Sequence, residues 1–473
     1  MKKIKCIHFV GIKGVGMTPL AIIAKEAGFK VTGSDIADEF VTAEPLKKAK
    51  IKPFVGFSEK NISKADLVIT TGAHGGFENL EVVAARKKSI KILTQGEAVG
   101  LFMSGEIFER RQVGISVTGC HGKTTTTAMT ALIFKECMQD PSFVIGSGNI
   151  PSLGSCGHFG KGNYFICEAD EYATEPVFDK TPKFLWQKPK IAIFTNIEFD
   201  HPDLFASVDE VRNAFLKFAN QLPSDGILIA NGDDAQTKKL IQDYRGKVIT
   251  FGFSPGNNYI LKRVSISGSQ TFFWVDAYGV SLGEFSINVI GDFNALNALG
   301  AIIAALESGL DTEKIKKSLK MFTGTKRRFE YIGKLSSGAL LFDDYAHHPT
   351  EIKSTLNAFR KAFPKSKIVC IFQPHTYSRT KILFEQFSCS FIDCDTVILT
   401  DIYPSLREVP DPHVSSMHLV SEIAKHHKIA LFCPKLSDVI EYIRQKDYKD
   451  NTIVITMGAG DIYKIGENLE VKS

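Results

Sequence analysis

The chain has 473 residues, and at roughly 150 residues per domain this length predicts about three domains rather than one large core. Apolar residues make up 44% and charged residues 23%, which excludes a disordered or low-complexity chain. The net charge of +5 is small for this length and suits anionic small molecules, whereas nucleic-acid-binding proteins concentrate their basic residues in one patch. We therefore expect no nucleic acid partner.

The first block, residues 1–107, alternates strands with helices, which predicts a parallel sheet with right-handed crossovers. Expected strands are Ile4–Val10, Lys30–Gly33 and Asp66–Thr71, and expected helices are Met17–Gly28 and Glu78–Ser89. The first turn, residues 11–16, reads GIKGVG and nearly matches a dinucleotide fingerprint, but Lys13 replaces its second glycine. The turn therefore favours an anionic nucleotide over a nicotinamide cofactor.

The second block, residues 108–324, opens with the expected strand Val113–Val117, which runs into Gly119-Cys-His-Gly122-Lys123-Thr124 and then a helix to about Cys137. A glycine turn between a strand and a helix is the context of a phosphate-binding loop. Lys123 is expected on the terminal phosphates and Thr124 on Mg²⁺. The loop is shorter than the usual motif, because Val117 stands where its first glycine belongs.

Acidic residues follow two further expected strands of this block. Glu168 comes directly after the strand Tyr164–Cys167, and Asp200 and His201 follow the strand Lys190–Thr195. Strand ends in open parallel sheets face the ligand crevice, and oxygen ligands suit Mg²⁺. The sequence therefore predicts a metal site beside the phosphate loop.

The rest of the block predicts antiparallel hairpins over Tyr259–Val289, where apolar and polar residues alternate, and then a helix over Gly291–Glu307. Asn294 and Asn297 lie three residues apart on one face of this helix, and an amide can both donate to and accept from a purine edge. Asn294 alone is equally consistent with a helix N-cap.

The third block, residues 325–473, is a further α/β unit. Its expected strands are Ala339–Phe342, Lys367–Phe372, Thr396–Thr400, Ile429–Phe432 and Thr452–Thr456, with helices such as Thr350–Phe363 and Lys381–Ile392 between them. Arg328 at its start is either solvated or a phosphate clamp.

The nine cysteines contain no Cys-x-x-Cys pair, which favours reduced thiols in a cytoplasmic protein. The first apolar run is too short for a signal peptide, and no stretch reaches the ~18 uncharged apolar residues of a membrane-spanning helix. We therefore expect a cytoplasmic protein without membrane insertion.

Eight segments occur in the order GIKGVGM, TGCHGKTTTTAM, CEADE, NIEFDHPD, NALNALGA, RRFE, DDYAHHPTEI and FQPHTYSRT. Together they resemble the Mur ligase family of bacterial peptidoglycan synthesis, and they span the whole chain. The resemblance implies an α/β protein of three domains. These are an N-terminal Rossmann-like domain for a UDP-sugar (1–107), a central P-loop ATPase-type domain with a mixed sheet (108–324), and a C-terminal Rossmann-like domain for an amino acid (325–473).

The resemblance also implies roles for individual residues. ATP is expected at Gly119, Cys120, His121, Gly122, Lys123, Thr124, Thr125, Asn294, Asn297, Arg328 and Asp344, and the UDP-sugar at Gly14, Val15, Gly16, Ser34 and Asp35. Mg²⁺ is expected on Thr124, Glu168 and His201, and the amino acid near His348, His375 and Arg379. The residues expected to act in catalysis are Lys123, Glu168, His201, Arg328 and His348.

The implied activity is that of an ATP-dependent, ADP-forming ligase. It joins L-alanine to the lactyl carboxylate of UDP-N-acetylmuramate through an acyl phosphate, as part of peptidoglycan precursor synthesis and hence of cell shape and division. Its partners are these small molecules, and the protein is expected to be a monomer or a homodimer.

Alternatives stay open. The segments EADEYATEPVFDKTPKF and EFDHPDLF are closer to a branch of the family that attaches a murein tripeptide, whereas FQPHTYSRT and GAGDIYKI are closer to the alanine branch. Because the C-terminal domain selects the amine, alanine is favoured. A nicotinamide dehydrogenase and a regulatory ATP-binding module remain further readings. Phe293, Lys13 and Thr376 depart from the residues that the family usually has at these positions.

Overall fold

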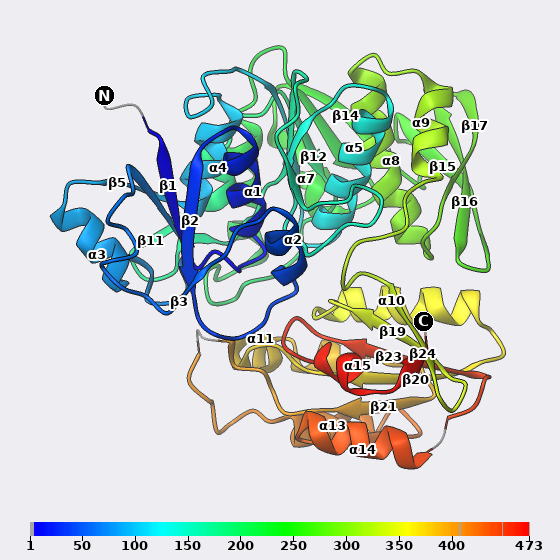
Figure 1. Cartoon of the computed structure of the whole chain (residues 1–473). Helices are drawn as coiled ribbons and strands as arrows, with labels where there is room; N and C mark the ends of the chain where they lie inside the picture. Colours follow the sequence, from blue (N-terminus) through cyan, green and yellow to red (C-terminus); the bar gives the residue numbers. More distant parts are fainter. Residues whose placement is uncertain (1–3, 406–407, 447, 473) are drawn as a thin grey trace.

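The computed structural model describes residues 4–405, 408–446 and 448–472, which form three α/β units, each around its own sheet. In Figure 1 the N-terminal and central units lie side by side, and the C-terminal unit lies beneath them. This confirms the expected three-domain α/β architecture. The domain boundaries at 107/108 and 324/325 stay predictions.

The N-terminal sheet is parallel throughout, with strand order β3-β2-β1-β4-β5. Its strands are β1 (Cys6–Val10), β2 (Lys30–Asp35), β3 (Phe54–Val55), β4 (Leu67–Thr70) and β5 (Lys91–Thr94). Its helices are α1 (Thr18–Glu26), α2 (Ala43–Lys48), η1 (Gly76–Glu78), α3 (Leu80–Lys87) and α4 (Gln95–Met103). One expected helix is divided, because Asn79 leaves helical geometry and its side chain caps α3.

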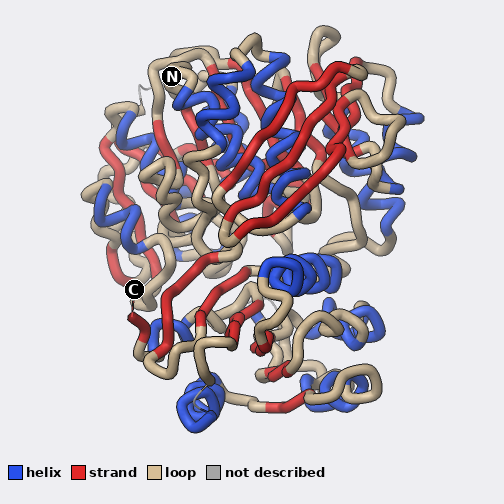
Figure 2. Tube along the Cα trace, turned by 90° about the vertical axis from the view of Figure 1, so that its right-hand side faces the viewer, coloured by secondary structure: helices blue, strands red, loops and turns tan. Residues whose placement is uncertain are grey.

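The central sheet is mixed, with strand order β17-β16-β15-β14-β13-β12-β6-β9-β7-β8. Its strands are β6 (Val113–Thr118), β7 (Ser142–Val144), β8 (Gly157–His158), β9 (Tyr164–Glu168), β12 (Ile191–Phe194), β13 (Ile227–Asn231), β14 (Lys247–Gly252), β15 (Tyr259–Ser267), β16 (Gln270–Ala277) and β17 (Val280–Ile287). The predicted hairpins are β15–β17, whose long strands run side by side at one edge of the sheet (Figure 2).

The remaining elements of the central unit include α5 (Lys123–Glu136) and α8 (Asp292–Glu307), the two helices whose first turns border the candidate site. The others are β10 (Ala173–Glu175), β11 (Asp179–Pro182), η2 (Lys183–Trp186), α6 (Val208–Ala219), α7 (Ala235–Asp243) and α9 (Thr312–Leu319). Helices α5 and α8 pack together and bury their apolar side chains against the sheet in one core. This core fixes the N-terminal ends of both helices beside the carboxyl ends of the parallel strands.

The C-terminal sheet has strand order β22-β21-β20-β23-β19-β18-β24, in which only β18 runs antiparallel to its neighbours, β19 and β24. Its strands are β18 (Glu330–Leu335), β19 (Leu340–Asp344), β20 (Lys367–Phe372), β21 (Thr396–Leu399), β22 (Ala430–Phe432), β23 (Thr452–Met457) and β24 (Val471–Lys472). Its helices are α10 (Pro349–Ala362), α11 (Tyr377–Ile382), α12 (Phe384–Ser388), α13 (Ser416–Ile423), α14 (Leu436–Lys446) and α15 (Lys464–Asn468). The single helix expected over 381–392 is instead α11 and α12, because Leu383 leaves helical geometry between them.

All three units meet at one point. A Cβ on Gly148 of the central unit would lie 2.7 Å from the Val41 carbonyl oxygen and 3.4 Å from the side chain of Lys326. Among the described residues, no helix combines the length and apolar character needed to cross a membrane.

Candidate active site between the central and C-terminal units

The loop between β6 and α5 has the geometry of a phosphate-binding turn. Gly119 and Gly122 both have positive φ, at 139° and 81°. A Cβ on Gly119 would overlap the Thr195 hydroxyl, and one on Gly122 would overlap the amide of Asn297. Helix α5 begins directly after this loop without a side-chain cap, so its first N–H groups are directed at whatever the loop binds.

Lys123 is the charged centre of this loop. Its Nζ lies 2.9 Å from both carboxylate oxygens of Glu171 and donates to the Gly119 carbonyl at 2.6 Å. Burial opposes the charge of Lys123, but the Glu171 carboxylate outweighs it and raises the pKa of the ammonium. The Glu171 carboxylate thus keeps the Lys123 side chain positively charged beside the loop.

Thr124 and Glu168 lie together, as predicted. The Thr124 hydroxyl donates to Glu168 at 3.2 Å, and the other oxygen of Glu168 accepts from the Gly146 N–H at 2.6 Å. Burial raises the pKa of Glu168. A hydroxyl and a carboxylate at the start of a phosphate-loop helix are the oxygen donors that Mg²⁺ takes.

His201 follows β12 and belongs to a neighbouring cluster. Its Nε2 lies 3.6 Å from Glu171 and 3.7 Å from Asp200, and these three side chains are close enough to share a cation. The direct partners of Glu168 are therefore Thr124 and Gly146, whereas those of His201 are Glu171 and Asp200.

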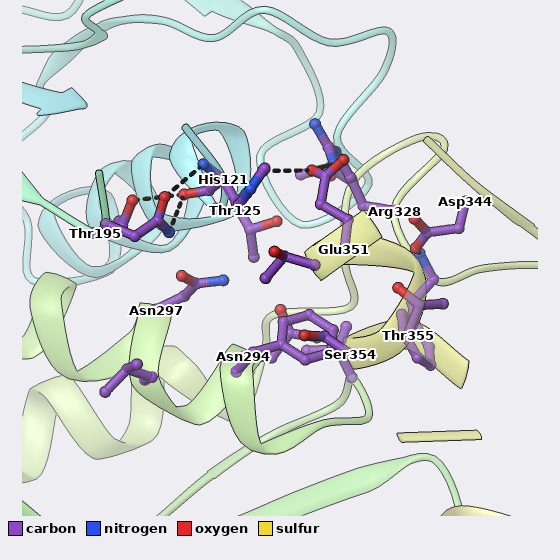
Figure 3. A pocket seen from close by; sticks show the side chains of 18 of the residues that line it. His121, Thr125, Thr195, Asn294, Asn297, Arg328, Asp344, Glu351, Ser354 and Thr355 are labelled. Carbon is purple, nitrogen blue, oxygen red and sulfur yellow. Dashed lines mark hydrogen bonds and ion pairs between the residues drawn. The ribbon is translucent and has the colours of Figure 1, made fainter. Parts of the chain in front are cut away.

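A pocket lies beside the phosphate loop, between the central and C-terminal units (Figure 3). Predicted residues that line it are His121, Gly122, Thr125, Asn294, Asn297, Arg328 and Asp344. Asn294 donates its amide to the Ile290 carbonyl at 2.7 Å, which holds it in the first turn of α8. Phe293 also lines the pocket and contacts the ring of Phe329, so this departure from the family pattern adds an apolar wall.

Arg328 and Asp344 bring the C-terminal unit to this pocket. Arg328 pairs with Glu351 at 3.2 Å and lies over the ring of Tyr345. Asp344, at the end of β19, accepts the backbone N–H groups of Phe329 and Ala346 at 2.8 and 2.7 Å. Burial raises the pKa of Asp344 to about 6.

His121 links the two units. Its Nδ1 lies 3.3 Å from Glu351 on α10, and its Nε2 lies 3.4 Å from Glu198 of the central unit. Burial opposes protonation, but the two carboxylates raise the pKa of His121 to about 10. Thr350 completes the contact by donating its hydroxyl to Glu198 at 2.7 Å.

Arg379 makes a second link between the units. It donates to Asp200 at 2.6 and 3.0 Å, with both side chains only 4% exposed. Despite burial, Arg379 holds the pKa of Asp200 well below its usual range. Arg379 also lies 3.2 Å from His375, while His348 is buried at the start of α10 and its Nδ1 accepts from Thr350 N–H. Thr376 takes a positive φ of 68° just before α11.

The expected UDP-sugar residues lie in the N-terminal unit. Val15 is exposed, whereas Ser34 and Asp35 are buried within β2. Ser34 donates to the buried Glu81, and Asp35 accepts the backbone N–H of Lys13 at 2.7 Å. Asp35 thus supports the glycine turn, whereas the Ser34 side chain is engaged with Glu81, and neither side chain lies open to solvent.

Sequence reasoning assigned no role to three carboxylates of the site. Glu171 was visible inside the acidic segment, and Glu351 stands three residues after His348, the spacing of a capping box. Glu198 gave no signal, because its contacts with His121 and Thr350 cross 77 and 152 residues. Of the expected nucleotide ligands, Cys120 has its thiol buried against the backbone of Glu198.

Comparison with known proteins matches each of the three units to a domain of one protein family. Residues 6–106 match the model of the Mur ligase family catalytic domain, residues 117–305 the Mur ligase middle domain, and residues 327–460 the Mur ligase glutamate ligase domain. A UDP-N-acetylmuramate–L-alanine ligase of Desulfitobacterium hafniense is 40% identical over 98% of this chain and 99% of its own. One of Clostridium acetobutylicum is 40% identical over 98% and 97%.

Solved structures of two related ligases have the same fold over nearly the whole chain. UDP-N-acetylmuramate-alanine ligase MurC of Thermotoga maritima superposes with a TM-score of 0.80 at 30% identity, covering 98% of this chain and 97% of the other. A murein peptide ligase of Psychrobacter arcticus shares the fold, with a TM-score of 0.71 at 24% identity over 98% of both chains. Since full-length relatives and all three domain models agree, the chain belongs to the Mur ligase family.

Proposed function

We propose that this protein is an ATP-dependent, ADP-forming ligase that joins L-alanine to the lactyl carboxylate of UDP-N-acetylmuramate in cytoplasmic peptidoglycan precursor synthesis. The observation that carries the proposal is the pocket beside Lys123, which residues of the C-terminal unit also line. The chain that forms this pocket is 40% identical to L-alanine ligases over nearly its full length. These relatives favour this activity over a tripeptide ligase or a nicotinamide dehydrogenase.

ATP is proposed to lie with its phosphates on the loop at the start of α5 and its base in the pocket. Asn294 and Asn297 offer their amides to the base from α8, and Asp344 offers a carboxylate to the ribose from β19. Lys123 exchanges the Glu171 carboxylate for phosphate oxygens, so the cation is already desolvated and in place when ATP arrives.

Mg²⁺ fits the donors beside the loop. Thr124 and Glu168 would hold it, with His201 on the neighbouring cluster, and the ion would neutralise phosphate charge. Oxygen donors meeting at a helix N-terminus support this assignment. Arg328 brings a further positive charge to the pocket from the C-terminal unit.

The chemistry needs no nucleophilic side chain. The lactyl carboxylate attacks the γ-phosphorus of ATP, which releases ADP and leaves an acyl phosphate. The amine of L-alanine then attacks the acyl carbon, loses a proton, and displaces inorganic phosphate to form the amide. Holding three reactants in line supplies most of the rate, and Lys123 and Arg328 stabilise the charge on the transferring phosphoryl group.

The substrates are proposed to approach from the other two units. The UDP-sugar binds over the glycine turn at Gly14 and Gly16, which Asp35 supports from below. The amine binds near His348, His375 and Arg379. Because Asp200 already holds Arg379, the guanidinium is fixed at the boundary between the central and C-terminal units.

The test is phosphate release from ATP in the presence of Mg²⁺ and UDP-N-acetylmuramate, with L-alanine, glycine, L-serine or murein tripeptide as the amine. We expect release to depend on both the sugar and L-alanine, and the amide product to appear in equal amount. Faster turnover with the tripeptide would reassign the amine, and hydrolysis without amide would contradict ligase activity.

A further inference from the structure

Two histidines and a carboxylate meet at the boundary between the central and C-terminal units. His121 comes from the phosphate loop, Glu198 from the segment after β12, and His348 from the N-cap of α10. One ligand atom from each side chain lies within 4.8 Å of the other two. None of these contacts is used by the magnesium donors Thr124 and Glu168.

The spacing fits a small tetrahedral metal ion. His121 Nε2 lies 3.4 Å and His348 Nδ1 lies 3.5 Å from the same oxygen of Glu198. Zinc–nitrogen and zinc–oxygen bonds of about 2.0–2.1 Å place neighbouring tetrahedral ligands roughly 3.4 Å apart. An ion placed between these atoms has three possible ligand atoms within 4.8 Å of one another. It would displace the 3.4 Å contact between His121 and Glu198 and the 3.3 Å hydrogen bond from Thr350 N–H to His348.

The surroundings also have the form of a metal site. The far nitrogen of His121 faces Glu351 at 3.3 Å, the carboxylate–histidine–metal relation that orients metal-bound imidazoles. Thr350 donates its hydroxyl to Glu198 at 2.7 Å and orients that carboxylate. Both His121 and Glu198 line the nucleotide pocket, which leaves a fourth position for a water molecule or a ligand.

The charges attract a cation to this point. Two carboxylates, Glu198 and Glu351, lie within 3.4 Å of the His121 ring, one at each nitrogen. Arg328 is the cation paired with Glu351, at 3.2 Å. A divalent ion would take the place of the hydrogen bond between His121 and Glu198.

We infer that the nucleotide-free protein binds one ion of the Zn²⁺ type through His121, Glu198 and His348, and that this ion bridges the central and C-terminal units. Nitrogen donors favour such an ion over Mg²⁺, which prefers oxygen. Because its ligands come from two units, the ion fixes them in the arrangement seen here.

Cobalt(II) titration of the full chain without nucleotide tests the inference, and it needs no substrate, so its outcome is independent of the ligase activity. We expect one equivalent of Co²⁺ to give the intense visible bands of four-coordinate cobalt, which Zn²⁺ then abolishes. His348→Gln and Glu198→Gln should lose the bands, and Glu351→Gln should weaken binding by about tenfold or more. Circular dichroism checks that each variant is folded.

His158→Gln is the matched control. His158 also faces two carboxylates, but Glu26 and Asp140 lie at opposite ring nitrogens, at 2.9 and 3.1 Å, so one ion cannot take all three. This variant should keep the full signal. The inference is overturned if no visible bands appear, if His348→Gln retains them, or if thiolate charge-transfer bands show that cysteine binds the metal.

Discussion

The chain uses the same local pattern twice, a strand, a glycine turn with a lysine, and a helix, yet the two turns are built differently. In the N-terminal unit, Lys13 donates to the carbonyls of Ile36 and Asp38, and a carboxylate, Asp35, already fills the turn by accepting its backbone N–H. In the central unit, Lys123 also donates to the carbonyls of its loop, at Gly119 and Cys120, but it is held in addition by the Glu171 carboxylate.

The helix starts differ as well. Neither helix has a side-chain cap, but α1 begins at Thr18 and has Pro19, which lacks an N–H, at its second position, whereas the first turn of α5 from Lys123 has no proline. An incoming phosphate can replace the Glu171 carboxylate on Lys123, since both are anions, whereas the carbonyl partners of Lys13 belong to the N-terminal fold itself. From this comparison we expect the partners of each lysine, rather than the glycines of the turn, to decide which lysine contacts a phosphate.

The largest expected effect comes from Lys123→Ala. Removing the ammonium takes away the charge that faces the transferring phosphate, so kcat for phosphate release should fall by at least about 10³-fold, or roughly 4 kcal/mol. The motivation is the buried Lys123–Glu171 pair. Near-normal phosphate release from the folded variant, measured with all three substrates, would refute the assignment.

The second effect compares two glycines. At Gly122 an added methyl group meets the Asn297 amide and requires φ of 81°, so Gly122→Ala should lower stability by about 2 kcal/mol and raise the KM for ATP about tenfold or more. At Gly14 the nearest atom is the Gly11 carbonyl oxygen at 3.4 Å. Gly14→Ala should therefore stay within about 0.5 kcal/mol of the parent protein. Equal melting shifts in the two variants would break the comparison.

The third effect is a pH dependence of the phosphate loop, which contains His121, whereas residues 11–16 contain no histidine. His121 has its folded-state pKa raised from 6.5 to about 10. Its pairing with the carboxylates therefore stabilises the fold fully below pH 6.5, and this contribution is lost as the pH rises toward 10. Between pH 6.5 and 9.5 the parent should lose at least about 2 kcal/mol more stability than His121→Asn, measured by melting temperature. Parallel curves for the two proteins would contradict this linkage.

Sequence patterns predicted the three α/β units and the helices α1, α3, α5, α8 and α10, because these elements carry their own local apolar patterns. The phosphate loop was predictable for the same reason, since Gly119 to Thr124 form one continuous segment. Likewise, Thr124 follows β6 and Glu168 ends β9, and because these strands are parallel neighbours, topology alone brings the two residues together.

Contacts between units had no such signal. Arg379 and Asp200 lie 179 residues apart, and Thr350 and Glu198 lie 152 apart. No local pattern records which side chains face each other once two separately folded units meet. The sequence for this reason placed Arg379 at the amino-acid pocket, without showing that a buried carboxylate of the central unit holds it.

The smallest expected effect comes from Lys13→Ala, and it tests the comparison of the two glycine turns most directly. Lys13→Ala removes hydrogen bonds of 2.6 and 2.7 Å to the carbonyls of Ile36 and Asp38, in a partly exposed turn, and should cost about 1 kcal/mol of stability. If Lys13 serves to shape the turn, the KM for the UDP-sugar rises only about threefold, while kcat and the KM for ATP stay unchanged.

A phosphate-binding role for Lys13 like that of Lys123 predicts a different kinetic signature. The ammonium would leave its carbonyl partners when the diphosphate binds, so its loss would weaken the UDP-sugar by two orders of magnitude or more, as is common for a buried charged contact. Lys13→Arg separates the two roles. This variant preserves the positive charge but changes the short hydrogen bonds to the carbonyls of Ile36 and Asp38. It should therefore bind the UDP-sugar normally only if the sugar needs the charge of residue 13 rather than the shape of the turn.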